Sequence, residues 1–306
     1  MLPRGGTVLQ SVNQAELHAK LISLQGRVIF DEPLFLHTTL AIGGRATCFF
    51  LPTTIGILQE AISLCNEYEF AYMILGAGSN VIFPDKGYLG MVIGTSQLRG
   101  ASIGDGWVHA LAGEPLAELI TRLDQANRQS LNFLAGIPGS LGGAIAMNAG
   151  IPERAIGQEV GQVAILNSAT RIEVIPAKDC GFSYRTSVFV KNKLPILWAK
   201  MNLNGKVYDR IEILNRRRLS QPSSAYSAGC VFKNPPGLSA GRLIEQAGLK
   251  GFRVGMAKVS EKHANFIINC GGATSAQVLE LIDIIRRKVY KSSHIQLEME
   301  LEVIGE

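Results

Sequence analysis

The segment from Ala135 to Gly150 is the part of this chain that most limits how it can fold. Its sixteen residues include five glycines and four alanines. So little side-chain volume allows another backbone, or a ligand, to approach the main chain closely. A tight helix-packing seam, or a plain loop, would have the same composition. The segment therefore predicts a close approach without identifying what approaches.

A second glycine-rich turn, Leu75–Val81, lies about sixty residues earlier. It has two of the three glycines of a dinucleotide fingerprint, but Val81 occupies the third place and an apolar run follows where a helix should start. The Rossmann interpretation is therefore weak, and the absence of Gly-Lys-Ser/Thr excludes a P-loop. A strand, tight turn and strand remain, either as a plain hairpin or as a turn whose N–H groups hold a pyrophosphate. Two such turns could enclose one extended cofactor.

Length and composition indicate an ordinary globular protein. A chain of 306 residues with 47% apolar and 18% charged residues predicts two or three ordered domains. The first twenty residues lack the apolar stretch of a secretory signal, and no run of 18 apolar residues predicts a membrane span. The cysteines are few, odd in number and without a CxxC pair, which favours a reducing cytoplasm over disulfides or a metal site. They are Cys48, Cys65, Cys180, Cys230 and Cys270.

The net charge of +5 and the pI near 9.0 raise the possibility of a nucleic-acid partner. The basic residues are dispersed, however, apart from the trios 216–218 and 286–288. The second trio falls on a predicted helix, where a solvated face explains it. Because no nucleic-acid motif accompanies these charges, we expect no nucleic-acid partner. A modest positive excess also suits anionic small molecules such as nucleotides.

Periodicity predicts a mixture of helices and strands. Residues 54–65 have helical spacing, 72–75 form a short apolar strand, and Pro115 opens another helix. Residues 161–176 alternate around a turn, as a hairpin does. Without regular βαβ alternation, these elements indicate the α+β class.

The last hundred residues have their own signals. Residues 240–247 predict a short helix stopped by Gly248, and Thr274 with Gln277 predicts a capping box for a longer helix. Residues 297–303 alternate as a strand with three carboxylates on one face. We expect the last domain boundary between residues 204 and 217.

Several motifs together resemble a known family. They are Leu75–Val81 and Ile137–Gly150, preceded by residues 38–44 and followed by 181–187, 227–235, 240–250 and 297–305. The first three are similar to the FAD-binding domain of the vanillyl-alcohol-oxidase/PCMH superfamily. The complete ordered set most resembles the UDP-N-acetylenolpyruvoylglucosamine reductases, in the shorter of their two architectural types.

The resemblance implies a domain organisation. It predicts an N-terminal segment over residues 1–34 and a two-subdomain PCMH-type FAD-binding domain over 35–205, with the subdomain boundary near residue 100. A smaller α+β substrate-binding domain would follow over 206–306. The protein would be a monomer without membrane insertion, and its FAD would be non-covalent because no histidine and cysteine are placed to attach it.

The matching positions imply which residues bind FAD, largely through their backbones. They are Gly43, Gly76, Ala77, Gly78, Ser79, Asn80, Val81, Ile137, Pro138, Gly139, Gly142, Gly143, Ala146, Met147 and Gly150.

The reaction implied by the resemblance has two halves and belongs to peptidoglycan precursor synthesis. NADPH would reduce FAD, which then gives hydride to C3 of the enolpyruvyl group of UDP-N-acetylglucosamine-enolpyruvate, and protonation at C2 yields UDP-N-acetylmuramate. Arg185 matches the arginine that would stabilise the developing negative charge, and Glu300 matches the catalytic glutamate. Periodicity cannot separate Glu300 from Glu298 and Glu302, so this choice depends on the motif.

Two positions depart from the family pattern. Cys230 stands where the family's proton donor is typically serine, and Glu302 stands where the family often has arginine. A thiol with an ordinary pKa near 8.5 is mostly protonated at neutral pH, so Cys230 can still donate a proton. Glu302 removes a cation and adds an acid, which makes the orientation of Glu300 uncertain. An isolated cysteine would more commonly be a small buried hydrophobe.

The resemblance also implies side chains for the substrate diphosphate: Asn234 and Lys250, with Arg218 and the nearby Tyr184. The polar stretch 260–265, which contains His263, matches the family but receives no chemical role. Two alternatives remain open from the sequence. One is another flavin oxidoreductase of the same superfamily, and the other is a nucleotide- or FAD-binding protein that has lost its chemistry.

Overall fold

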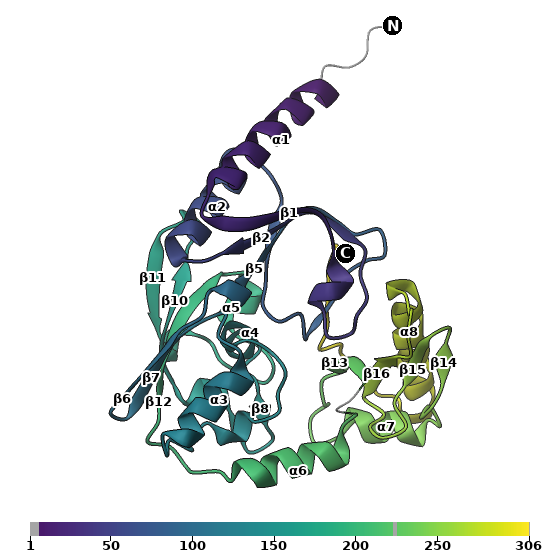
Figure 1. Ribbon diagram of the computed structural model, residues 1–306. Coiled ribbons are helices and arrows are strands. Elements are labelled where there is room, and N and C mark those ends of the chain that lie inside the picture. The colour runs from purple at the N-terminus through teal and green to yellow at the C-terminus, as the bar shows by residue number, and fades with distance from the viewer. Residues whose placement is uncertain (1–5, 223–224, 306) are drawn as a thin grey trace, which may run out of the picture.

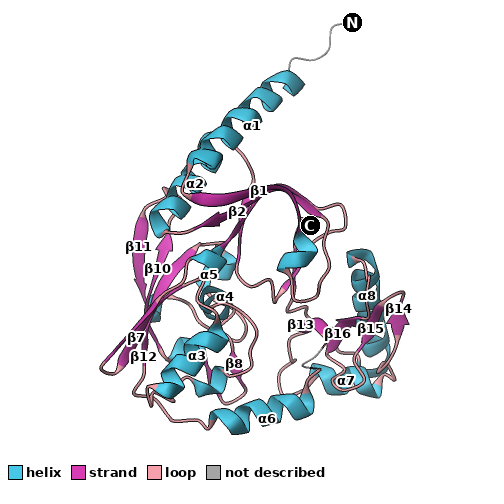
Figure 2. Cartoon of the chain, viewed as in Figure 1, coloured by secondary structure: helices cyan, strands magenta, loops and turns pink. Residues whose placement is uncertain are grey.

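The computed structural model describes residues 6–222 and 225–305, with side chains from residue 15 onward. Helices and strands are mixed along the chain (Figure 2), which confirms the α+β class. None of the described helices is both long enough and apolar enough to cross a membrane.

The first sheet has four strands in the order β1-β2-β5-β3. They are β1 (Gly26–Pro33), β2 (Arg45–Pro52), β5 (Tyr88–Gly94) and β3 (Tyr72–Leu75). β1 runs antiparallel to β2, whereas β2, β5 and β3 are parallel. Helices α1 (Gly6–Ser23) and α2 (Ile55–Glu67) bury leucines and isoleucines against this sheet, and α1 then extends away from it (Figure 1).

The second sheet is antiparallel, with five strands in the order β11-β10-β12-β7-β6. They are β11 (Ile172–Pro176), β10 (Val160–Leu166), β12 (Ile196–Asn202), β7 (Trp107–Leu111) and β6 (Ala101–Gly104). One face shares a core with α3 (Leu116–Gln125), α4 (Leu141–Ala146) and α5 (Val188–Lys191). Ala164, Leu166 and Leu197 join the core of the first sheet instead. The two sheets are therefore held together by continuous packing.

The third sheet is formed after α6 (Arg210–Ser220), which runs along the edge of the molecule between the second sheet's helices and the C-terminal part (Figure 1). Its strand order is β13-β16-β15-β14, all antiparallel. The strands are β13 (Tyr226–Cys230), β16 (Phe266–Asn269), β15 (Ala257–Val259) and β14 (Arg253–Val254). Helices α7 (Ala240–Gln246) and α8 (Ser275–Ser293) bury their apolar faces against it.

Short pairings tie the end of the chain to its beginning. β17 (Glu302–Val303) pairs in parallel with β4 (Val81–Ile82), directly after the first glycine-rich turn. Leu40, Ile42 and Ile82 also join the core of the third sheet. A separate ribbon, β8 (Gly150–Ile151) and β9 (Arg154–Ala155), follows the second glycine-rich segment. These links place residues near position 300 beside the loop at 76–81.

Most local predictions are confirmed. The helix expected over 54–65 is α2, which begins with a hydrogen bond from the Ile57 N–H to the Thr54 hydroxyl. The hairpin expected over 161–176 is the antiparallel pair of β10 and β11. The capping box of Thr274 and Gln277 has both of its hydrogen bonds. Each of these signals depends on residues close in sequence, which is why they could be recognised.

Two predictions differ from the structure. The Leu75–Val81 turn is not a hairpin, because β3 pairs with β5 while β4 pairs with β17. Residues 297–303 do not form one continuous strand either: Met299 bridges to Phe232, and only 302–303 pair with β4. Because parts of this segment pair with different segments of the chain, the carboxylates of Glu298 and Glu300 point in different directions. The Glu298 side chain is 72% exposed, whereas that of Glu300 is 13% exposed.

Candidate active site

A cavity of about 1660 Å³ lies where the two glycine-rich segments meet α6 and the third sheet. Pockets for single small ligands usually measure about 300–1,000 Å³, so this one has room for a cofactor and a second molecule. Its lining includes every residue predicted to bind the cofactor except Gly43. Gly43 instead packs tightly on Phe83, where an added Cβ would lie 2.8 Å from the Phe83 Cβ.

The two glycine-rich segments touch each other. A Cβ on Gly76 would lie 2.6 Å from the Ser140 hydroxyl oxygen, and one on Gly139 would lie 3.4 Å from the hydroxyl of Ser79. Gly78 has a φ of +61°, and its Cβ would lie 1.9 Å from the His37 carbonyl oxygen. Glycine at 76 and 78 is thus required by the packing of the chain itself, which brings both segments to one wall of the cavity.

Free backbone donors distinguish the first loop from the second. Within the described residues, the N–H groups of residues 77–80 donate no hydrogen bond. At the start of α4, by contrast, the Leu141 and Gly142 N–H groups donate to carbonyls at 2.9 and 2.8 Å. The Gly143 N–H there donates to the Ser140 hydroxyl at 3.3 Å. Successive free N–H groups form an anion site, so the first loop can hold a diphosphate while the start of this helix cannot.

Arg185, Cys230 and Glu300 line the same cavity although they are far apart in the sequence. Arg185 lies in a two-residue turn closed by hydrogen bonds between Ser183 and Thr186. Cys230 ends β13, and Glu300 precedes β17. The Arg185 Nε lies 2.9 Å from the Glu300 Oε1, so the two side chains form an ion pair. The Nε has no hydrogen-bond partner among the described residues, so the contact is not a well-aligned hydrogen bond.

Burial raises the pKa of the Glu300 carboxyl above its usual range, while Arg185 and Lys233 act in the opposite direction. Desolvation disfavours the charged carboxylate more than the nearby cations favour it. The Lys233 ammonium also forms an ion pair with a second carboxylate, since its Nζ lies 2.5 Å from the Glu298 Oε1. The site thus holds a carboxyl group that takes up a proton more readily than an exposed glutamate.

One peptide segment fixes Cys230 and Glu300 relative to each other. The Val231 N–H donates to the Asn265 carbonyl, and the Glu300 N–H donates to the Val231 carbonyl, both at 2.8 Å. The buried Asn265 amide then accepts from the Phe232 N–H at 2.9 Å and donates to the Phe232 carbonyl at 2.7 Å. The sequence reasoning missed Asn265, although it lies in the polar stretch 260–265 that matched the family. A buried amide with both groups satisfied makes this frame rigid.

The Cys230 thiol faces this frame. Burial, and then the charge of Glu300, raise its pKa to about 12, while Arg185, Arg217 and a hydrogen bond with Asn265 lower it. The residue as a whole is only partly buried, but protein atoms crowd its sulfur. The thiol is therefore protonated at neutral pH, as a proton donor must be.

Thiol reactivity provides a test of this protonation state. With a pKa of about 12, Cys230 has a thiolate fraction of about one in ten thousand at pH 8, and only the thiolate is nucleophilic. Iodoacetamide should therefore modify the exposed Cys270 well before Cys230. Peptide mass spectrometry over a time course measures both rates in one sample. Equal rates for Cys230 and Cys270 would contradict the protonated assignment.

The residues predicted to bind the substrate diphosphate are only partly brought together. Asn234 and Arg218 line the cavity, whereas Tyr184 and Lys250 do not. Tyr184 is nevertheless adjacent, since its hydroxyl accepts the Asn234 N–H at 3.3 Å. The Lys250 Nζ forms an ion pair with the Glu245 Oε1 at 2.7 Å.

Further charged residues also line the cavity, among them Glu302 and Arg217. Glu302, the second departure from the family pattern, has an exposed side chain at the cavity wall. Arg217 also lines it, although the sequence favoured its neighbour Arg218.

Comparisons with known proteins agree over most of the chain. The model of an FAD binding domain matches residues 46–163, and that of the UDP-N-acetylenolpyruvoylglucosamine reductase C-terminal domain matches residues 221–304. The reductases of Alkaliphilus oremlandii and Heliobacterium modesticaldum are 39% and 40% identical, over 92% of this chain and 95% and 92% of theirs. The solved reductase of Thermus caldophilus is 34% identical, with a TM-score of 0.75 over 92% of this chain and 99% of that one.

The fold and the cavity define a class of protein: an FAD-dependent oxidoreductase with a PCMH-type FAD-binding domain. The sequence identity near 40% to the two reductases, over most of both chains, identifies one family within that class. The chain belongs to the UDP-N-acetylenolpyruvoylglucosamine reductase family.

Proposed function

We propose that this protein catalyses the NADPH-dependent reduction of UDP-N-acetylglucosamine-enolpyruvate to UDP-N-acetylmuramate, a step of peptidoglycan precursor synthesis in the cytoplasm. The observation that carries the proposal is the meeting of Arg185, Cys230 and Glu300 at one cavity wall beside both glycine-rich segments. We further propose that the enzyme acts as a monomer, with the FAD-binding domain over 35–205 and the substrate domain over 206–306.

The cavity fits a non-covalently bound FAD. The free N–H groups of residues 77–80 would hold its diphosphate, and the small residues of 137–150 would let the cofactor approach the backbone. Bound there, FAD would accept a hydride from NADPH and supply it to C3 of the enolpyruvyl group. The remaining volume would be shared by the two substrates.

The protein side chains supply the charge stabilisation and the proton. Arg185, held by Glu300 at 2.9 Å, places a positive charge where negative charge develops beside the substrate carboxylate. Cys230 gives its thiol proton to C2, since its raised pKa keeps it protonated before the reaction. Glu300 orients Arg185, and the Val231–Asn265 frame holds Cys230 and Glu300 in place. Tyr184, Arg218, Asn234 and Lys250 would serve the diphosphate end of the substrate.

The proposal is tested by NADPH consumption by the purified, FAD-loaded protein with and without UDP-N-acetylglucosamine-enolpyruvate. We expect oxidation of NADPH that depends on this substrate, with a product two hydrogens heavier by mass spectrometry. Flavin that NADPH bleaches without substrate-dependent turnover would instead indicate another oxidoreductase of the superfamily. Flavin that NADPH cannot bleach would indicate a binding protein without this chemistry.

A further inference from the structure

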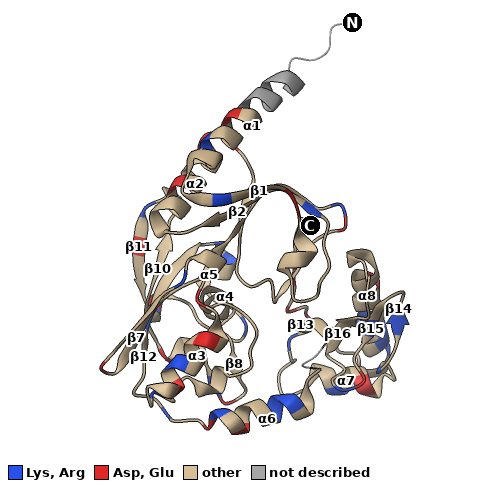
Figure 3. Cartoon of the chain, in the orientation of Figure 1, with Lys and Arg blue, Asp and Glu red and all other residues tan. Residues whose placement is uncertain are grey.

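Arg217 occupies an unusual place for an arginine on a surface helix. It lies on α6, where Figure 3 marks a run of basic positions, and its side chain is half-buried at the cavity. The aliphatic stem packs on Gly136, whose added Cβ would lie 3.0 Å from the Arg217 Cδ. Gly136, Arg217 and Cys230 all line the same cavity.

The guanidinium of Arg217 is not satisfied by the part of the chain that the structure describes. Its Nε has no hydrogen-bond partner there, and its Nη1 donates only to the Gln221 side chain at 3.4 Å. No described carboxylate forms an ion pair with it, whereas the neighbouring Arg216 pairs with Glu153 at 3.4 Å. Burial and the positive charge of Arg185 lower the pKa of Arg217 to about 10. A half-buried cation beside a second cation requires an anion from outside the chain.

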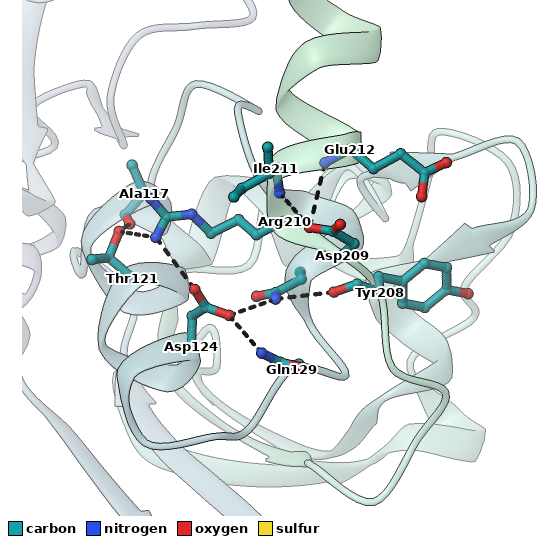
Figure 4. A network of polar contacts seen from close by, with 10 residues as sticks. Ala117, Thr121, Asp124, Gln129, Tyr208, Asp209, Arg210, Ile211 and Glu212 are labelled. Carbon is teal, nitrogen blue, oxygen red and sulfur yellow. Dashed lines mark hydrogen bonds and ion pairs between the residues drawn. The ribbon is translucent and has the colours of Figure 1, made fainter.

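Polar contacts anchor the start of the helix that carries Arg217. At its start, the Asp209 side chain accepts the Ile211 N–H at 2.8 Å, and Arg210 lies 3.6 Å from Asp124 (Figure 4). Asp124 also accepts from the Asn132 amide at 2.9 Å. Arg217 follows Arg210 by two helical turns, about 10 Å along the axis at 1.5 Å per residue. An arginine positioned in this way loses little freedom when an anion binds.

We propose that Arg217, together with Arg185, binds the carboxylate of the enolpyruvyl group and thereby selects the substrate that carries it, an inference that rests on the proposed function. Arg217 lines the same cavity as Arg185 and Cys230, the two residues proposed to act on the enolpyruvyl end. Arg185 is already paired with Glu300, whereas the buried Arg217 Nε has no hydrogen-bond partner in the described part of the chain and can meet a second carboxylate. A guanidinium binds a carboxylate through two parallel hydrogen bonds.

The test compares two ligands that differ by the enolpyruvyl group: UDP-N-acetylglucosamine-enolpyruvate and UDP-N-acetylglucosamine. Binding to the oxidised, FAD-loaded enzyme is measured by calorimetry and by the flavin absorbance. Arg217→Gln should weaken binding of the first ligand by about 10–100-fold, the range expected for one charged hydrogen-bonding group, and that of the second by less than about threefold. Arg217→Lys should recover part of the loss, because lysine restores the positive charge but cannot form the two parallel hydrogen bonds of a guanidinium.

Arg45→Gln is the control, since it removes the same charge from an exposed ion pair with Asp31, outside the cavity lining. It should change neither affinity. An equal loss for both ligands in Arg217→Gln would overturn the proposal and assign Arg217 to the diphosphate, and no loss would also overturn it. If Arg217→Gln retains no flavin, the Arg217→Lys comparison decides between these outcomes. Failure of the wild-type enzyme to turn over the enolpyruvyl ligand would refute the proposed function itself, which is a different result.

Discussion

Alanine at position 230 should lower substrate-dependent turnover by about 10²–10⁴-fold, the usual contribution of a positioned acid. Cys230 is the protonated group at the cavity wall beside Arg185 and Glu300, and Cys230→Ala removes the proton that C2 needs. Bleaching of the bound flavin by NADPH should continue at the wild-type rate, because the thiol has no part in that half of the reaction. Stopped-flow absorbance separates the two halves.

Serine provides the informative replacement at this position. Cys230→Ser keeps a protonated donor of similar size, so turnover should stay within about tenfold of the wild type. Cys270→Ala removes an exposed thiol and should have no effect on either half of the reaction. Normal turnover by Cys230→Ala would contradict the proposed role and transfer the donation of the proton to another group. Equal slowing of both halves would instead indicate a structural defect.

Local sequence signals predicted much of the secondary structure but little of its assembly. The capping box, the hairpin and the helix stop at Gly248 each depend on a few neighbouring residues, and the structure has them. The pairing of β17 with β4 joins segments that are about 220 residues apart. No local pattern encodes such a partner, so the alternation of residues 297–303 predicts one strand with a shared acidic face. In the folded protein, Met299 bridges to Phe232 while residues 302–303 pair with β4, and Glu300 between them is turned inward.

The orientation of α6 shows that helical periodicity could have predicted the burial of Arg217. Adjacent residues on a helix point about 100° apart, so Arg217 and Arg218 differ in burial although both line the cavity: Arg217 is half-buried and Arg218 is exposed. Arg217 follows the buried Ile213 by four residues and the partly buried Leu214 by three, which places it on their face. That spacing was present in the sequence, but the polar composition of the helix concealed which face was covered. The motif comparison favoured Arg218, whereas the structure also brings Arg217 to the cavity.

The backbone of Arg185 is a feature that no sequence pattern revealed. Its φ of +54° is in the left-handed region, which costs a residue with a Cβ about 1–2 kcal/mol. The tight turn between Ser183 and Thr186 imposes this conformation, and the turn directs the side chain to Glu300. Strain of this kind persists where the surroundings fix it, and it is frequent at functional sites.

Arg185→Gln should have the second large effect, with a fall in kcat of about 10²–10³-fold, the cost of removing one donor to a developing negative charge. The same variant leaves the buried Glu300 carboxylate without its ion-pair partner. An unsatisfied buried group costs about 1–3 kcal/mol, so the free energy of unfolding should fall by that amount at neutral pH. Urea denaturation measures this loss. The control is Arg45→Gln, whose exposed ion pair with Asp31 should contribute less than about 1 kcal/mol.

The loss of stability should depend on pH in a defined direction. The pKa of Glu300 is already raised in the folded protein by burial, and removing Arg185 raises it further because Arg185 favours the charged form. A carboxyl whose folded pKa is raised binds its proton more tightly when folded, so stability falls as pH increases through that pKa. At low pH the carboxyl is neutral in both proteins and the difference is small. The deficit of Arg185→Gln should therefore grow from about pH 5 to pH 8.

Neutralising both Arg185 and Glu300 separates the effect of Arg185 on the free energy of unfolding from its effect on turnover. In the double variant Arg185→Gln with Glu300→Gln, no buried carboxylate remains to be desolvated, so most of the stability deficit at pH 8 should disappear. Turnover should not recover, because the positive charge at the enolpyruvyl end is still missing. Recovery of turnover in the double variant would show that Arg185 serves only to neutralise Glu300. A deficit that is the same at pH 5 and pH 8 would show that the ionisation of Glu300 is not its cause.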